Sequence, residues 1–282
     1  MANPSVTLGN SGYTEDDPPQ IVDSGASAND ADGNSDWDTG ASLTAQITNN
    51  ADANDEVRIA NTSDITVSGP SVEDGGGTVF GTISETSGAN NDDGIVTGGD
   101  TLTVDFDSDA TNARVEDLVQ ALAFRNTSDT PGGATRDLTA TLTDMSGGSG
   151  NSVSSISVTP TNDAPTLATN DTTSLNEGAE TFIPKGNLEA TDPEQGPANL
   201  TYTLDSVPAN GDLFIDGTGA GSDNGTVDGE TALAMGDTFT QAKIESDDLI
   251  YVHDGGETTS DSLDVTVDDG SGGNTGTKTV DL

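Results

Sequence analysis

The stretch that decides the fold is Thr159–Pro165, which reads TPTNDAP. Before it lies a β-rich block that closes with Asp144 and the glycine-rich run Gly147–Asn151. After it comes a second block, which closes in nearly the same way with Asp268–Asn274. The chain therefore contains two copies of one architecture, joined by a linker that carries carboxylate and amide oxygens. Such an arrangement is typical of stacked modules in an array and not of a free-standing enzyme.

The composition limits the size of the core. A chain of 282 residues favours two domains. Only 30% of the residues are hydrophobic and 4% aromatic, which is enough for two small sandwich cores but not for one large α/β core. We place the domains at residues 1–161 and 162–282.

The charge balance is extreme, with 50 acidic residues against 7 basic ones and a net charge of −43. Self-repulsion of this size destabilises a compact state unless cations compensate it, either as bound divalent ions or as concentrated salt. The composition is thus typical of a halophilic or marine protein. Because the chain has no basic stripe, we expect neither nucleic acid nor an anionic membrane as a partner.

Targeting and redox signals are sparse. The chain has no cysteine, which excludes disulfides and cysteine-based metal sites. The start, Met1–Pro4, lacks the features of a signal peptide, and no apolar run reaches the roughly 18 residues that span a bilayer, so no membrane insertion is expected. The strand pattern continues to Leu282, so we expect a piece of a longer exported protein.

Alternation of apolar and polar residues indicates an all-β fold with half-buried strands. Clusters of Gly, Asn, Asp and Pro separate these strands, as in tight turns. One amphipathic helix is predicted over Thr111–Ala123, with Asp109 or Thr111 as its cap, and a shorter one over Thr240–Glu245. The alternating residues are Leu43, Ala45 and Ile47; Leu102, Val104 and Phe106; Leu138, Ala140 and Leu142; Leu200, Tyr202 and Leu204; and Leu263, Val265 and Val267.

Two groups of motifs resemble a known family. In the second half, Gln241–Ile244, Leu249–Asp254 and Asp261–Leu263 are similar to the chondroitin-sulphate-proteoglycan type of repeat, which is a cadherin-like module. In the first half, Tyr13–Glu15, Asp30–Asp32 and Phe124–Pro131 resemble cadherin-like repeats of large prokaryotic surface proteins. The resemblance implies two tandem Greek-key β-sandwiches of cadherin or immunoglobulin type, with Ca²⁺ at the junctions.

The residues themselves point to the same sites, because calcium takes six to eight oxygen ligands from carboxylates, amides and backbone. For the second domain we expect ligands in the linker, the loop between its second and third strands and the last hairpin. Glu15 of the first domain is expected to approach the same junction. The predicted set is Asn162, Asp163, Asp192, Glu194, Asp268, Asp269 and Glu15.

The equivalent set of the first domain is Asp30, Asp32 and Asp144, with Asn3 as the remnant of a preceding linker. Glu177 is expected to serve a junction beyond Leu282. The linker lacks the longer acidic run of vertebrate cadherins, so one ion per junction is expected. A simpler reading of all these loops is solvated Asx-turns in a salt-adapted protein.

Three further motifs each have a functional and a structural interpretation. Asp105–Asp109 with Glu116 has the spacing of an EF-hand, but Ala110 stands where the turn glycine belongs, so a helix cap is favoured. His253 lies in a strand motif and is expected to be structural. Trp37 either stacks on a sugar or covers the end of a core, and we expect the latter.

The sequence as a whole predicts a non-enzymatic, calcium-binding extracellular tandem repeat, acting as the extender or adhesive segment of a large cell-surface protein. Its expected partners are neighbouring repeats of the same or identical chains. Two alternatives remain: a self-assembling filament or surface-layer subunit that exchanges strands, and a polysaccharide-binding module using Trp37 and Asn210–Asp212.

Overall fold

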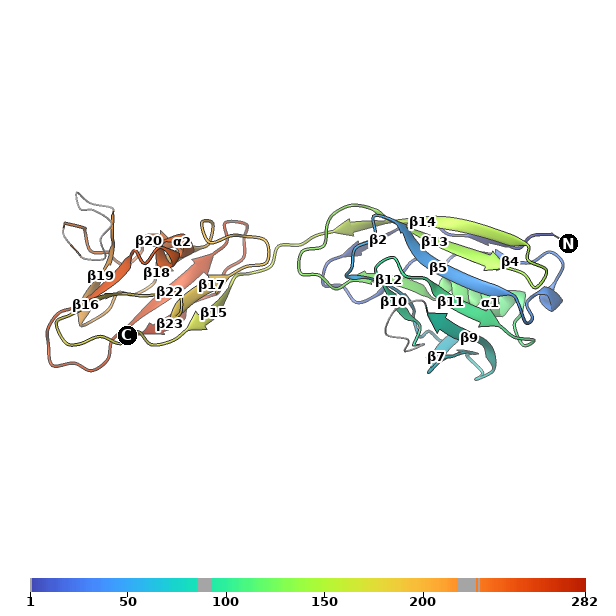
Figure 1. Ribbon diagram of the computed structural model, residues 1–282, viewed down its shortest axis with the longest axis horizontal. Helices are drawn as coiled ribbons and strands as arrows, with labels where there is room; N and C mark the ends of the chain where they lie inside the picture. The colour runs from blue at the N-terminus through green and yellow to red at the C-terminus, as the bar shows by residue number, and fades with distance from the viewer. Residues whose placement is uncertain (1, 86–92, 218–226, 228) are drawn as a thin grey trace. The chain divides into compact units, whose positions relative to one another are not determined.

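The computed structural model describes residues 2–85, 93–217, 227 and 229–282. It divides into two compact units, Met1–Thr161 (unit 1) and Asn162–Leu282 (unit 2). Strands are the main regular secondary structure of both units (Figure 1). The predicted all-β class, with a short helix in each unit, is confirmed.

Unit 1 contains three sheets. Its strands are β1 (Ser5–Thr7), β2 (Ser11–Thr14), β3 (Gln20–Ile21), β4 (Ser27–Asn29), β5 (Ser42–Asn49), β6 (Asp55–Ile59), β7 (Ile65–Ser68), β8 (Ser71–Asp74), β9 (Val79–Glu85), β10 (Ile95–Thr97), β11 (Leu102–Phe106), β12 (Leu122–Asn126), β13 (Arg136–Thr143) and β14 (Ser149–Thr159). The largest sheet has the order β2-β14-β13-β5-β11-β9-β8-β7, the second is β10-β6-β12-β3, and β1 pairs with β4. All pairs are antiparallel except β14 with β2.

Unit 2 repeats the plan with fewer strands. They are β15 (Thr166–Asn170), β16 (Glu180–Phe182), β17 (Leu188–Thr191), β18 (Thr201–Leu204), β19 (Gly211–Ile215), β20 (Thr238–Thr240), β21 (Leu249–His253), β22 (Ser262–Asp268) and β23 (Lys278–Asp281). The sheets have the orders β20-β18-β22-β23, β16-β21-β19 and β15-β17.

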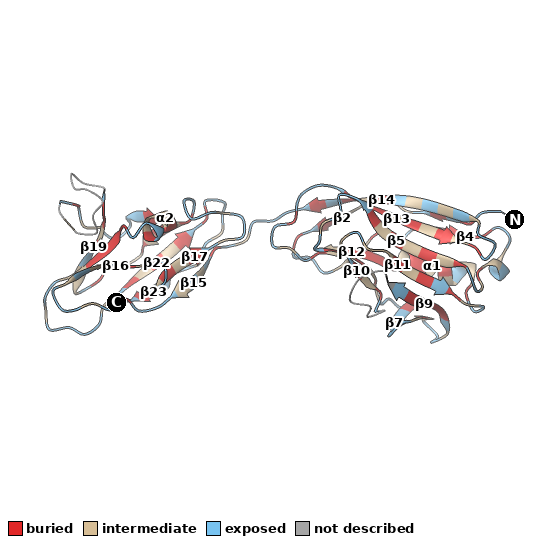
Figure 2. Cartoon of the chain, viewed as in Figure 1, coloured by how far each residue is buried: buried red, intermediate tan, exposed pale blue. Residues whose placement is uncertain are grey.

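The predicted alternation decides which faces are buried. Every apolar residue of the five alternating segments is buried, and the polar residues between them are not (Figure 2). Strand β13 shows the pattern over its full length, with buried and half-buried residues in strict alternation. Each unit has its own apolar cluster, so each sandwich is held together by its own core.

Helix α1 (Asn112–Gln120) is shorter than the predicted Thr111–Ala123. Thr111 is its N-cap, and the Thr111 hydroxyl accepts a hydrogen bond from the backbone N–H of Arg114. The prediction was wrong at the other end, because Leu122 begins strand β12, which pairs with both β6 and β3. Two ladders of backbone hydrogen bonds outweigh one further helical turn there. Helix α2 (Gln241–Glu245) confirms the shorter helix of the second half.

Among the described residues, neither helix is long or apolar enough to cross a bilayer.

A buried ion pair lies inside unit 1. Arg136 on β13 is 2% exposed, and its Nε lies 3.1 Å from Oδ2 of Asp55, whose side chain is fully buried. Asp55 also accepts hydrogen bonds from the side chain of Asn126 at 2.7 Å and from the backbone N–H of Asp52 at 2.7 Å. The Arg136 guanidinium donates further to the carbonyls of Gly132 and Ala134. Both charged groups thus have several hydrogen-bond partners, which compensate the cost of keeping them in a core.

The seven basic residues are all described, and six of them form ion pairs. The pairs join Arg58 and Arg125 to Glu56, Arg114 to Asp74, Arg136 to Asp55, Lys185 to Glu189 and Glu245, and Lys243 to Asp248. Lys278 is the remaining base, and it is exposed. Most of the cationic charge is therefore neutralised locally, and the acidic loops receive little of it.

Strand β7 is one of the two edges of the largest sheet, and neighbouring side chains form hydrogen bonds with its backbone. The amide of Asn61 accepts a hydrogen bond from the backbone N–H of Val67 at 2.8 Å. The hydroxyl of Thr62 accepts from the backbone N–H of Ile65 at 3.0 Å. Satisfying edge groups within the chain removes a template for pairing with another strand.

Candidate metal centres

The linker end of unit 2 gathers polar side chains from three segments. The side-chain amide of Asn162 donates to Oδ2 of Asp269 at 2.7 Å. The backbone N–H of Asp163 donates to Oε2 of Glu194 at 3.2 Å. Asp269 is 2% exposed and is held by the backbone N–H groups of Ser271 and Gly273. The linker, the loop after β17 and the hairpin after β22 thus meet at one end of the unit.

The loop after β17 is an Asx-turn. Oδ1 of Asp192 accepts hydrogen bonds from the backbone N–H groups of Glu194 and Gln195, at 2.9 and 2.8 Å. The side-chain amide group of Gln195 lies between Asp192, Asn162 and Ser271. Asp192 and Glu194 therefore lie on the same small surface as the linker residues.

The carboxyl of Asp269 has a lowered pKa. Burial raises this pKa, but the side-chain amide of Asn162 and the backbone N–H groups of the hairpin lower it further than burial raises it. Asp269 is therefore anionic at neutral pH, as a metal ligand must be. The neighbouring Asp268 is exposed at the end of β22, and its Oδ1 accepts from the backbone N–H of Gly270. Period-two alternation thus turns Asp268 away from the surface that Asp269 faces.

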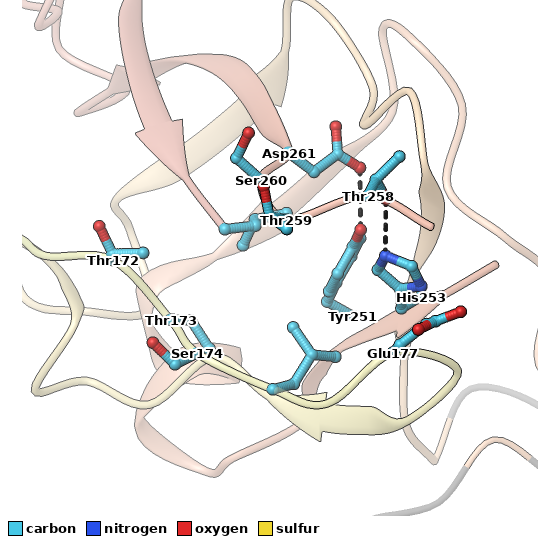
Figure 3. Close-up of a pocket in the computed structure, with 12 residues that line it drawn as sticks. Thr172, Thr173, Ser174, Glu177, Tyr251, His253, Thr258, Thr259, Ser260 and Asp261 are labelled. Carbon is cyan, nitrogen blue, oxygen red and sulfur yellow. Dashed lines mark hydrogen bonds between the residues drawn. The ribbon is translucent and has the colours of Figure 1, made fainter. Parts of the chain in front are cut away.

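Glu177 lies at the opposite end of unit 2. It lines a pocket of 140 Å³ together with His253, Tyr251 and Asp261 (Figure 3). Asp261 directly precedes the start of β22, whereas Asp269 follows its end. Nδ1 of His253 accepts hydrogen bonds from the backbone N–H groups of Gly255 and Gly178, so Nε2 carries the proton and donates to Thr258. Both ring nitrogens thus form hydrogen bonds within unit 2, in agreement with a structural role for His253.

The corresponding acidic end of unit 1 contains Asp30 and Asp32 after β4 and Asp144 after β13. Asp30 and Asp144 are each 1% exposed. Oδ1 of Asp30 accepts a hydrogen bond from the backbone N–H of Asp32. Oδ1 of Asp144 accepts hydrogen bonds from the backbone N–H groups of Ser146 and Gly148. The backbone N–H of Ala2 donates to Asp32.

Asp144 and Asp269 occupy equivalent positions in the two units. In unit 1, a Cβ on Gly148 would collide with Oδ2 of Asp144 and lie 2.9 Å from Oδ1 of Asn3. In unit 2, a Cβ on Gly273 would collide with Oδ2 of Asp269 and the backbone of Asp163. Both hairpins thus use glycine to bring the chain entering the unit against a buried carboxylate. The pKa of Asp144 is also lowered, chiefly by the Ser146 hydroxyl and then, against the effect of burial, by backbone N–H groups.

Sequence reasoning missed Asp36. This residue lies in the 3-10 turn η1 (Asn34–Asp36), and carboxylate oxygens of Asp30, Asp32 and Asp36 lie within 4.8 Å of one another. The signal available in the sequence was the alternate spacing of positions 30, 32, 34 and 36. The predicted ligand set of unit 1 stopped at Asp32, because the turn that brings Asp36 back to Asp30 cannot be read from the spacing alone.

Glu15 lies at the other end of unit 1, where the chain leaves it. The backbone N–H of Glu15 donates to the carbonyl of Thr159, and its Oε2 accepts from the backbone N–H of Thr161 at 2.6 Å. Glu15 therefore caps the last residue of unit 1.

Trp37 does not offer a face to a ligand. Its side chain is fully buried, packs edge-on against Phe106 at a centroid distance of 5.7 Å, and donates from Nε1 to Asn112. The alternative in which Trp37 stacks on a sugar was wrong. The tryptophan covers the end of the core, as expected.

The chemistry of these groups fits calcium. Oδ2 of Asp30 and Oδ2 of Asp144 are buried without a hydrogen-bond partner in the described structure. Buried carboxylate oxygens normally have partners, and these two atoms remain available as ligands of a cation. The groups offer only oxygen, which suits a hard cation and does not suit zinc.

A family model described as Cadherin-like matches residues 165–280, which lie within unit 2. The chain is 29% identical over 107 residues to human FRAS1-related extracellular matrix protein 1, covering 38% of this chain and 4% of the relative. It is 31% identical over 107 residues to human extracellular matrix organizing protein FRAS1, covering 38% of this chain and 2% of the relative. The chain thus spans a very small part of these proteins. Unit 2 thus matches a cadherin-like family model, and the chain is similar to short stretches of two extracellular matrix proteins.

Solved structures show weaker similarity over nearly the whole chain. Human CDH23 EC21-23 matches at 14% identity with a TM-score of 0.33, covering 99% of this chain and 68% of that one. DIP-gamma IG1+IG2 matches at 10% identity with a TM-score of 0.30, covering 99% and 96%. These similarities concern the fold alone.

Proposed function

We propose that the chain is a calcium-stabilised pair of repeats from a large extracellular surface protein, in which it acts as a spacer or adhesive segment. The observation that carries this proposal is the meeting of Asn162, Asp163, Glu194 and Asp269 at the linker end of unit 2. The cadherin-like match and the extracellular matrix relatives support the same class of function. The proposal includes prokaryotic origin, a non-enzymatic role and neighbouring repeats as partners.

In this mechanism calcium acts through charge and restraint. The ion neutralises carboxylates that converge within a chain of net charge −43. By binding linker residues and loop residues together, it limits the backbone freedom of Thr161–Pro165. Extracellular modules bind calcium with dissociation constants of about 10⁻⁴–10⁻³ M, so free calcium at about ten times that value adds roughly 1.4 kcal/mol to stability.

Calorimetric calcium titration of the decalcified chain tests this proposal, with two adjacent substitutions as a matched pair. Asp269→Asn removes the buried carboxylate that faces the linker, and Asp268→Asn removes the exposed one beside it. We expect Asp269→Asn and Asp163→Asn to remove one binding event and Asp268→Asn to leave it. Absence of calcium binding in the unmodified chain overturns the proposal and leaves the acidic loops as salt adaptation.

The alternatives have less support among the described residues. Trp37 is not available to a polysaccharide, because its side chain is buried in the core. The backbone N–H of Asn210 is likewise engaged, since it donates a hydrogen bond to Asp261. A filament built by strand exchange needs an open edge, and the edge at β7 is occupied by Asn61 and Thr62. A monomer at high concentration in native salt distinguishes the spacer from the filament.

A further inference from the structure

The acidic end of unit 1 combines converging carboxylates with unsatisfied buried oxygens. Asp30, Asp32 and Asp36 bring carboxylate oxygens within 4.8 Å of one another. Oδ2 of Asp30 and Oδ2 of Asp36 are buried and, in the described structure, have no hydrogen-bond partner. Asp30 is 1% exposed, so water does not replace the missing partner.

No basic side chain of the chain compensates this charge. Six of the seven bases pair with other acids, and the seventh, Lys278, belongs to unit 2. Three carboxylates so close together repel one another, because like charges a few ångströms apart near a protein surface are only partly screened by water. A bound cation removes both the repulsion and the unsatisfied oxygens.

The loop that carries these carboxylates is fixed to the core of unit 1. Oδ1 of Asn112, the first residue of helix α1, accepts from the backbone N–H of Asp30 at 2.9 Å and from Nε1 of Trp37 at 2.6 Å. The Asn112 side-chain amide donates to the carbonyl of Asp30 at 3.1 Å. Gly33 adopts φ 103°, which the turn between Asp32 and η1 requires. The carboxylates are therefore preorganised and not free to move apart.

Asp144 lies beside the same loop. The backbone N–H of Met145 donates to the carbonyl of Asp36 at 3.0 Å. Oδ2 of Asp144 is also buried without a partner in the described part of the chain, and both it and Oδ1 of Asn3 lie within 3 Å of the position that a Cβ on Gly148 would take. Further oxygen donors are thus available from the hairpin and the N-terminal segment of unit 1 itself.

We infer that Asp36 is a ligand of a calcium site made by unit 1 alone, together with Asp30 and Asp32. This inference rests on the proposed calcium-dependent function and adds a ligand and a location to it. Ligands of one calcium ion lie at about 2.3–2.6 Å from it, so carboxylate oxygens within 4.8 Å of one another are close enough to share an ion. The set contains no nitrogen or sulfur donor, so the site is specific for a hard cation.

Trp37 makes the site measurable, because it is the chain's single tryptophan and follows Asp36 directly. Terbium replaces calcium at oxygen sites and emits when a nearby indole transfers energy to it. We therefore choose terbium titration of the full chain with excitation of tryptophan, followed by displacement with calcium. Calcium calorimetry on the same samples reports all sites.

The decisive variants are Asp36→Asn and Asp38→Asn, which make the same change two residues apart. Asp38 belongs to no ligand group among the described residues, and its Oδ1 accepts from Thr39. We expect Asp36→Asn to lower the affinity for terbium, measured from the titration of the tryptophan-sensitised signal, by roughly tenfold or more. The reason is that the charge of the ligands tunes calcium affinity. Asp38→Asn and Asp269→Asn should leave that signal unchanged.

Two outcomes overturn the inference in distinguishable ways. Equal terbium affinity in Asp36→Asn and Asp38→Asn removes Asp36 from the site, while the calcium binding lost in Asp269→Asn keeps the proposed function. Absence of calcium binding by calorimetry in the unmodified chain overturns both. A buried-tryptophan emission spectrum in Asp36→Asn establishes that the variant is folded, so a lost signal then reports the site and not unfolding.

Discussion

The side-chain amide of Asn162 donates to Oδ2 of Asp269 at 2.7 Å, so the first residue of unit 2 is bonded to the hairpin at the end of its strand β22. The two residues are 107 positions apart in the chain. This contact binds the linker to unit 2 before any ion is considered. It also supplies the donor that lowers the pKa of Asp269.

Asn162→Ala should lower the stability of unit 2 by about 1 kcal/mol in calcium-free buffer, because a hydrogen bond to a carboxylate is lost at a partly exposed site. Asn176→Ala is the matched control, since the Asn176 side chain is exposed and forms no hydrogen bond in the described structure. Urea unfolding followed by far-ultraviolet circular dichroism measures both. Equal midpoints for the two variants would contradict the prediction.

Arg136→Met should destabilise unit 1 by about 3–5 kcal/mol, because it leaves the buried Asp55 carboxylate without its cationic partner. Arg58→Met is the control, since Arg58 lies 3.6 Å from a Glu56 that Arg125 also pairs with at 2.6 Å. The control should change stability by less than about 1 kcal/mol. Unit 1 is followed by the emission of Trp37, which belongs to its core.

Gly150→Ala should destabilise unit 1 by about 1–3 kcal/mol, because the new Cβ would overlap the carbonyl oxygen of Pro4. Gly132→Ala should have almost no effect, since no other atom lies within 4 Å of the position a Cβ would take. Thermal unfolding of both variants separates the steric effect from the general effect of replacing glycine. A melting temperature for Gly150→Ala equal to that of the unmodified chain would contradict this prediction, and would mean that the segment around Pro4 moves to make room for the new Cβ.

The carboxyl group of Asp261 should make the free energy of unfolding of unit 2 depend on pH. Burial raises its pKa, but the backbone N–H groups of Ala209 and Asn210, the Tyr251 hydroxyl and the backbone N–H of Ser262 lower it below its ordinary value. The unfolded chain then binds the proton more tightly than the folded one, so stability rises with pH. The contribution is present above about pH 4 and is lost as pH falls through the pKa of the folded state.

Urea unfolding at neutral pH, at about pH 4 and at about pH 3 measures this dependence. Asp261→Asn should be less stable at neutral pH and should lose less on acidification than the unmodified chain. Parallel pH curves for the two proteins would assign the acid sensitivity of unit 2 to other carboxylates, such as Asp269, whose pKa is also lowered by hydrogen bonds.

The parts of the fold that depend on local pattern were predictable. Alternation identified strands such as β5, β13 and β22 because a half-buried strand exposes every second residue. Arg136 was not predictable as a core residue, because its burial depends on Asp55, which lies 81 positions away. The β7–β8 hairpin likewise joins the large sheet only through pairing with β9.

The candidate sites show the same division. Sequence reasoning proposed Asp268 and Asp269 together, and only the register of β22 separates the buried Asp269 from the exposed Asp268. Asp36 was missed because its closeness to Asp30 depends on the turn at Gly33 and on the bonds to Asn112. Residue types can be read from the chain, but the direction of each side chain depends on contacts far along it.

The pairing of nearly all basic residues with nearby acids has a consequence for how copies of the chain interact in solution. Few cations remain to offset the net charge of −43 that one copy presents to another. Copies should therefore repel one another over a distance set by the Debye length, which is about 8–10 Å at moderate ionic strength. Concentrated salt shortens this distance and lets copies approach closely, whereas dilute salt keeps them apart.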